Sequence, residues 1–78
     1  MHNTRIQNAK DLGAVIRRSR RAQALRQDEL AGVAGVGIRF VVELEAGKST
    51  AQIGKILQVL HALGIRVDLS GPLSEDPR

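Results

Sequence analysis

Three glycines, Gly35, Gly37 and Gly47, divide the middle of this chain into short segments. Residues 27–34 carry a helical pattern of apolar positions that ends at Gly35. Residues 38–46 form a second short helical segment that ends at Gly47, because glycine accepts the positive φ at the end of a helix. Two short helices joined by a glycine turn of three or four residues form a helix–turn–helix unit. Such pairs also serve as plain scaffolding, so this pattern alone does not assign a function.

Further helices are predicted on both sides of this pair. Apolar residues at helical spacing predict a helix at about 10–23, with a run of arginines on its other side. Downstream, Ser49 and Gln52 have the spacing of a capping box, in which Ser49 caps a helix and Gln52 reaches back to the cap. Apolar residues then recur at helical spacing up to Gly64, where that helix is expected to end.

Residues 65–69 change to strict alternation, which predicts a β-strand. The apolar side of the strand carries Ile65, Val67 and Leu69, and the polar side carries Arg66 and Asp68. A lone strand leaves its edges unpaired, and no other segment of the chain has a strand pattern. Pairing with the same strand of a second copy would give a two-fold dimer. The predicted organisation is a flexible arm at 1–9, a helical domain at 10–64, a dimerising strand at 65–69 and a flexible tail at 70–78.

Composition limits the possible functions. The chain has 78 residues, no cysteine and a single aromatic residue, Phe40. Its two histidines, His2 and His61, lie far apart without matching ligands, so no metal or cofactor is expected. No nucleophile–base pair or phosphate-binding glycine loop is present, and a chain this small cannot enclose a substrate, so we do not expect an enzyme. The apolar runs are too short to span a bilayer, which favours a cytoplasmic protein.

The basic residues are unevenly placed, since Arg17, Arg18, Arg20 and Arg21 fall within five positions. The formal net charge is +4. A basic surface of this kind suits a polyanion such as DNA. A charge run can equally be an ordinary solvated helix face. The absence of several aromatic residues argues against a stacking platform for single-stranded nucleic acid.

Taken together, these features resemble the phage-repressor-like helix–turn–helix domain of the Cro/C1-type or XRE group. The matching positions are Ile16, Arg17, Arg20, Leu25, Gln27, Glu29, Leu30, Ala31, Gly35, Val36, Val41, Leu44, Glu45, Gly47 and the "ALGI" that ends at Ile65. The resemblance covers residues 12–65 and implies an all-α, lambda-repressor-like fold, here followed by the C-terminal strand that pairs in a dimer.

The terminal strand makes the chain similar to a narrower subgroup, the HipB-type antitoxins. That resemblance implies a repressor of its own operon that also binds a HipA-like serine/threonine kinase toxin. Two other interpretations stay open. One is a solitary repressor without a toxin partner, and the other is a toxin-binding inhibitor with little DNA role, because a fold does not determine a function.

The chain departs from the family pattern at three positions. Ala24 stands where the family usually has glycine or asparagine. Arg26 stands where a threonine or serine normally caps the second helix, and the loss of such a cap costs about 1 kcal/mol. Gly37 replaces the serine or threonine that usually caps the third helix, although glycine is an acceptable cap.

The resemblance also implies which residues would meet DNA. In this domain class the outward side of the third helix enters the major groove. On this chain that side carries the candidates for base readout, which are Ile38, Arg39, Val42 and Glu43. Arginine can pair with the two acceptors of guanine, and apolar side chains can contact thymine methyl groups. Arg39 could instead be a surface or phosphate-binding residue, and Ile38 and Val42 could be plain surface or a partner contact.

Two further sets of residues complete the prediction. The candidates for phosphate contacts are Arg26, Gln27, Gly37, Lys48, Ser49 and Thr50. By resemblance, Arg20 and Glu45 form a structural ion pair between the first and third helices and read no sequence. Phe40 is expected to pack between helices rather than touch DNA. His61 is expected to be a packing or surface residue.

Overall fold

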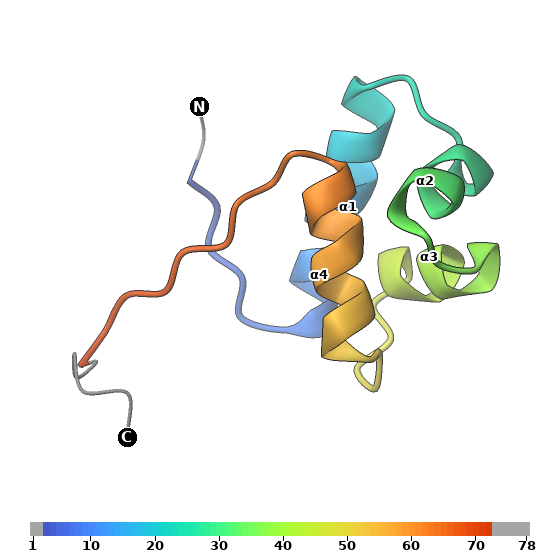
Figure 1. Cartoon of the computed structure of the whole chain (residues 1–78). Coiled ribbons are helices and arrows are strands. Elements are labelled where there is room, and N and C mark those ends of the chain that lie inside the picture. The colour runs from blue at the N-terminus through green and yellow to red at the C-terminus, as the bar shows by residue number, and fades with distance from the viewer. Residues whose placement is uncertain (1–2, 73–78) are drawn as a thin grey trace.

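The computed structural model describes residues 3–72 and contains four helices over that range (Figure 1). Their bounds are α1 Ala9–Ala22, α2 Gln27–Ala34, α3 Ile38–Glu45 and α4 Ile53–Ala62. The predicted helical domain at 10–64 is thus all-α. Residues 1–2 of the expected arm and 73–78 of the expected tail lie outside the described residues.

Local signals near the predicted positions set the ends of the first three helices. Asn8 caps α1, because its Oδ1 accepts a hydrogen bond from the N–H of Asp11 at 2.8 Å. Helix α2 has the predicted bounds and ends at Gly35, which adopts a left-handed φ of 75°. Helix α3 begins after Gly37 and ends one residue before the predicted position.

The predicted start of α4 is wrong. Ser49 is not a helix cap but lies in an exposed turn, and α4 begins only after Gln52, which makes no side-chain cap bond. The N–H of Lys48 donates to the carbonyl of Glu43 at 3.1 Å, so this residue still belongs to the closure of α3. The residues that follow are needed to carry the chain from α3 to α4, and Ala51 packs against the core on the way.

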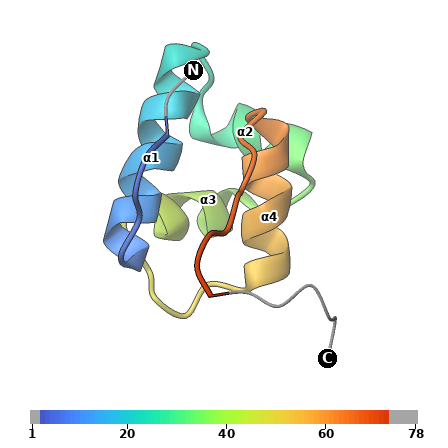
Figure 2. The ribbon, with the colours of Figure 1, turned by 90° about the vertical axis from the view of Figure 1, so that its left-hand side faces the viewer.

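The core sits where the helices meet. Figure 2 shows α3 lying across the molecule between α1 and α4, and α2 packs against both α3 and α4. All four helices contribute fully buried side chains, among which the largest are Ile16, Leu30, Val41, Leu44 and Val59. This packing fixes α3 by one side only, so its other side is free to face outward.

The crossing of α1 and α3 depends on Gly13. This glycine is buried, and a Cβ at this position would meet the carbonyl oxygen of Leu44 and, at 2.7 Å, that of Glu45. Real Cβ atoms essentially never approach a backbone oxygen so closely. The absence of a side chain therefore allows the two helix backbones to touch. Sequence reasoning did not single out this position.

The predicted β-strand at 65–69 is not seen, because these residues have no regular secondary structure in the described chain. Ile65 is half-buried and packs against the core, whereas Val67 is 51% and Leu69 79% exposed. A strand needs a neighbour for its N–H and C=O groups. Within residues 3–72 no second strand offers that edge, so the segment remains without a ladder.

Ala24 occupies an unfavourable backbone conformation. Its φ is 57°, the one positive φ of a non-glycine residue in the described chain. For an L-residue this left-handed region costs roughly 1–2 kcal/mol, whereas glycine adopts it freely. The turn between α1 and α2 requires this conformation, which explains why the family usually has glycine or asparagine at this position.

We therefore expect Ala24→Gly to stabilise the protein by about 0.5–1 kcal/mol, because relief of strain exceeds the greater freedom of glycine in the unfolded chain. Thermal unfolding should show a melting temperature higher by about 2–8 °C. Ala14→Gly, at an exposed position inside α1, is the matched control and should lower it. A lower melting temperature for both variants would contradict the role of strain at Ala24.

Candidate nucleic-acid interface

Helix α3 exposes one side along its length. Val41 and Leu44 are buried, whereas Ile38 is 52% and Val42 43% exposed. Arg39 is exposed as well. We call the side formed by Ile38, Arg39, Val42 and Glu43 the outward face of α3. Two exposed aliphatic side chains next to an arginine are costly in water but useful against a surface that offers methyl groups and hydrogen-bond acceptors.

The charges on and near this face differ in how they are paired. Glu43 accepts a hydrogen bond from Lys48 Nζ at 3.1 Å, so these two predicted DNA-contacting residues bind each other in the free protein. Arg39 has no carboxylate partner within residues 3–72. Its guanidinium is therefore available to a ligand without first breaking an ion pair.

Phe40 lies on the side of α3 between the outward face and the core. It is half-buried and packs against the core, as expected of an aromatic residue that joins helices. Lys55 Nζ of α4 lies 5.8 Å from the centre of its ring, which is within the range of a cation–π contact. Phe40 thus connects α3 with α4.

Beneath the interface, Arg20 of α1 and Glu45 of α3 form a buried ion pair. Arg20 Nε and Glu45 Oε2 are 2.6 Å apart, and a second bond joins Nη2 to Oε1 at 3.0 Å. The two side chains are only 10% and 4% exposed. Arg20 Nη1 also donates to the carbonyl of Leu25 at 2.7 Å, and Gln27 Nε2 donates to Glu45 Oε1 at 3.1 Å.

This network satisfies the charges that it buries. The hydrogen bond with Glu45 raises the pKa of Arg20, although burial acts in the opposite direction. No buried side-chain polar atom of the described residues lacks a partner. Arg20 and Glu45 therefore hold α3 against α1 and against the turn that precedes α2. Their charges compensate each other and are not available to a ligand.

The N-terminus of α2 lies beside this network. Arg26 is the N-cap residue without a side-chain cap bond, and its N–H donates to Glu29 Oε1 at 2.8 Å instead. Its guanidinium binds Asp28 at 3.0 Å; this bond raises the pKa of Arg26 and lowers that of Asp28. The side chain of Gln27, predicted to grip a phosphate, points to Glu45 in the free protein.

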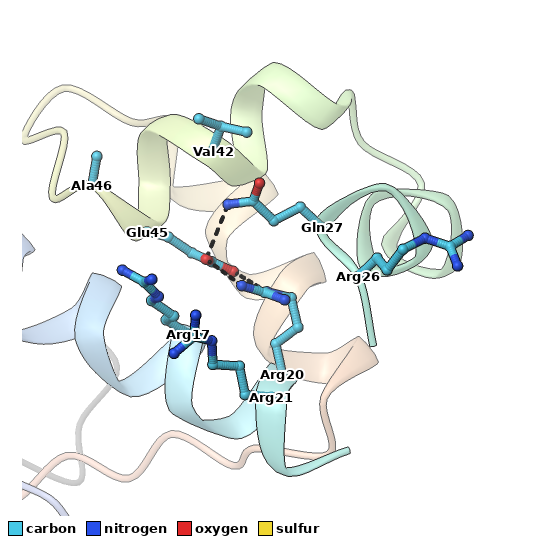
Figure 3. Close-up of a pocket in the computed structure, with 8 residues that line it drawn as sticks. All are labelled: Arg17, Arg20, Arg21, Arg26, Gln27, Val42, Glu45 and Ala46. Atoms are coloured by element: carbon cyan, nitrogen blue, oxygen red, sulfur yellow. Dashed lines mark hydrogen bonds and ion pairs between the residues drawn. The ribbon is translucent and has the colours of Figure 1, made fainter. Parts of the chain in front are cut away.

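The space between α1, α2 and α3 forms a groove that sequence reasoning did not find (Figure 3). We call it the basic groove. Its lining consists of Arg17, Arg20, Arg21, Arg26, Gln27, Val42, Glu45 and Ala46. The sequence shows the arginine run, but which of its members face α2 and α3 depends on how the helices cross.

The other predicted phosphate-binding residues lie at the two ends of α3. Gly37 stands at its N-terminus, and Lys48, Ser49 and Thr50 follow its C-terminus in an exposed turn. The structure therefore places cations or backbone N–H groups on several sides of the outward face.

His61 is exposed in the last turn of α4. Within residues 3–72 no group of histidine or carboxylate side chains has the arrangement of a metal site, and none of the described helices has the length and apolar character needed to cross a membrane.

Comparison with known proteins agrees with this geometry. The family model described as helix-turn-helix (HTH_3) matches residues 16–69. An uncharacterized HTH-type transcriptional regulator, y4mF, of Sinorhizobium fredii (strain NBRC 101917 / NGR234) is 63% identical over 68 residues, which cover 87% of this chain and 90% of that protein.

Solved structures show the same fold at low identity. A chain of a HipB–O4 20mer complex superposes with a TM-score of 0.81 at 17% identity, covering 91% of this chain and all of that one. A chain of a HipA–HipB–O2–O3 complex gives the same TM-score, identity and coverage. The match over residues 16–69, together with the relative at 63% identity, shows that this chain belongs to the helix-turn-helix (HTH_3) family of transcriptional regulators, which are not enzymes.

Proposed function

We propose that this protein is a sequence-specific DNA-binding repressor that reads an inverted repeat as a homodimer. The observation that carries the proposal is the composition of the outward face of α3. Arg39 lies there beside two exposed aliphatic side chains, and it has no carboxylate partner within residues 3–72. A helix with such a face can enter the major groove of a duplex, whose base edges offer both acceptors and methyl groups. Repression would follow from covering a promoter.

Each residue of the outward face has a defined task in this proposal. Arg39 binds guanine through its two major-groove acceptors, N7 and O6. Ile38 and Val42 contact thymine methyl groups. Glu43 accepts from a cytosine amino group once Lys48 has moved from it to a phosphate, which exchanges one surface ion pair of small stability for two DNA contacts.

The phosphate contacts surround this face. The N-terminus of α2 attracts a phosphate through its dipole and the N–H of Gln27, with the side chains of Gln27 and Arg26 beside it. Gly37 offers the same kind of backbone site at the start of α3. Lys48, Ser49 and Thr50 would hold the other side of the groove. These contacts position the protein on the duplex and carry no sequence information.

Dimerisation is proposed through residues 65–69. This segment leaves Val67 and Leu69 exposed, and on α4 the side chains of Ile53 and Leu57 are exposed as well. Pairing with a second copy would complete the missing ladder and cover apolar surface. In Figure 1 the segment runs on the side of α4 away from α3, so such a dimer leaves the outward face free. Two copies of α3 would then lie about 34–36 Å apart, one duplex turn.

An antitoxin role is the favoured elaboration. The solved structures with this fold include a HipB–O4 20mer complex and a HipA–HipB–O2–O3 complex. The alternating sequence pattern at 65–69 resembles the terminal strand of the HipB-type antitoxins. We propose a HipA-like serine/threonine kinase as the partner. A kinase-like gene directly downstream, whose product copurifies with this protein, would support the role; without such a gene the solitary repressor is the better description.

The test is a footprint on the DNA upstream of the protein's own gene. We expect protection of two half-sites with centres one helical turn apart, and Arg39→Ala should weaken binding about 10- to 100-fold, since a bidentate arginine–guanine pair discriminates by about 1–3 kcal/mol. Arg18→Ala, an exposed arginine of α1 away from this face, is the control. A wild-type footprint from Arg39→Ala would contradict base readout. A wild-type protein that binds no duplex would favour the toxin-binding inhibitor.

A further inference from the structure

The α1 wall of the basic groove is not accounted for by the DNA contacts proposed so far, which use only its α2 and α3 sides. One wall is formed by Arg17 and Arg21 of α1, and the other by Arg26 and Gln27 at the start of α2, with Val42 on the α3 side (Figure 3). Arg17 and Arg21 are four residues apart and so lie one turn from each other on the same side of α1. Both are exposed to solvent.

The arginines of the groove differ in how their charges are compensated. Arg20 is held by Glu45 in the buried ion pair. Arg26 lies 3.0 Å from Asp28 and 3.7 Å from Glu29. Arg17 and Arg21 have no carboxylate within 4.0 Å in the part of the chain that the structure describes. The free positive charge of the groove therefore comes from the α1 wall.

The position of the groove indicates its ligand. Val42 belongs both to the groove and to the outward face of α3, so the two surfaces are continuous. If α3 lies in the major groove of a duplex, the sugar–phosphate backbone of one DNA strand passes beside α3. That backbone then runs along the basic groove. A phosphodiester carries one negative charge and two free oxygens, which match the fork of an arginine.

We propose that Arg17 and Arg21 clamp a backbone phosphate of bound duplex DNA in the basic groove, across from Gln27. This inference rests on the proposed function, because it assumes a duplex held by α3. It adds α1 to the DNA-binding surface and gives the arginines of this helix different roles. Arg17 and Arg21 bind phosphate, whereas Arg20 stabilises the fold. Arg18 does not line the groove although it is exposed on the same helix.

The test compares Arg17→Gln, Arg21→Gln and the matched control Arg18→Gln. Binding is measured between about 0.05 and 0.3 M salt to a duplex of the DNA upstream of the protein's own gene and to an unrelated duplex of equal length. Each lost phosphate contact should reduce the slope of log K against log salt by about 0.9 per bound protomer and weaken binding about fivefold at 0.15 M. Arg18→Gln should keep the wild-type slope. Thermal unfolding verifies that all three variants fold.

The outcomes separate this inference from the function on which it rests. If the wild-type protein prefers its upstream DNA but Arg17→Gln and Arg21→Gln share the slope of Arg18→Gln, the clamp is wrong and the repressor stands. If the slopes fall as expected but neither duplex is preferred, the clamp stands and sequence-specific repression is wrong. If the wild-type protein binds neither duplex, both are wrong. Ethylation of single phosphates locates the contact, because interference at one phosphate should disappear in Arg17→Gln.

Discussion

Arg20→Ala is expected to cost about 3–5 kcal/mol of the free energy of unfolding. Removal of one partner from a buried ion pair leaves the other charge buried without compensation, here Glu45 with a side chain only 4% exposed. The carbonyl of Leu25 loses its donor as well. A domain of this size has roughly 4–12 kcal/mol of stability in total, so thermal or urea unfolding should show a variant that is largely unfolded or melts far below the wild type.

Two further variants separate charge from geometry. Arg20→Lys keeps the charge but cannot make the three hydrogen bonds of the guanidinium, so we expect an intermediate loss. Arg18→Ala removes an exposed arginine from the same helix and should change stability by less than about 0.5 kcal/mol. Equal melting temperatures for Arg20→Ala and Arg18→Ala would defeat the structural role of the pair.

Gly13→Ala is expected to destabilise the protein by about 1–2 kcal/mol, although alanine is the better helix former. The added Cβ would overlap the carbonyl oxygens of Leu44 and Glu45. Backbone oxygens cannot rotate away as a flexible side chain does, so α1 and α3 must separate, and overpacking of this kind costs about 1–3 kcal/mol. The same displacement would strain the Arg20–Glu45 pair, which joins these two helices.

Gly32→Ala provides the opposite expectation within the same protein. Gly32 lies inside α2, and a Cβ there would meet nothing within 4 Å. This substitution should therefore stabilise the protein by about 0.5–1 kcal/mol through helix propensity alone. Urea unfolding of both variants checks the pair of predictions. A gain of stability from both would show that the α1–α3 crossing does not require glycine.

The parts of the fold that follow from short-range rules could be predicted from the sequence. Gly35 ends α2 because a left-handed residue closes a helix, and the buried face of α3 follows from the spacing of Val41 and Leu44. The start of α4 could not be found in this way. Ser49 has the right spacing for a cap, but residues 49–52 form the connection between the end of α3 and the start of α4.

Features that depend on how helices cross were also missed. Gly13 looks like any helical glycine until α3 is placed against it, and Arg17 and Arg21 become a groove wall only through the position of α2. The readout and phosphate roles of the outward face stay predictions, because they concern a ligand rather than the fold. The alternation at 65–69 predicts a strand whose partner a single chain cannot supply.

The unpaired segment at 65–69 has a consequence for how repression depends on the concentration of the protein. If the ladder at 65–69 forms only when two molecules meet, the amount of repressor able to occupy a palindromic operator grows with about the square of protein concentration while monomers prevail. A small fall in synthesis or a modest rise in proteolysis would then release the promoter sharply rather than gradually. Strand pairing at 65–69 would thus set a protein concentration below which the promoter is released.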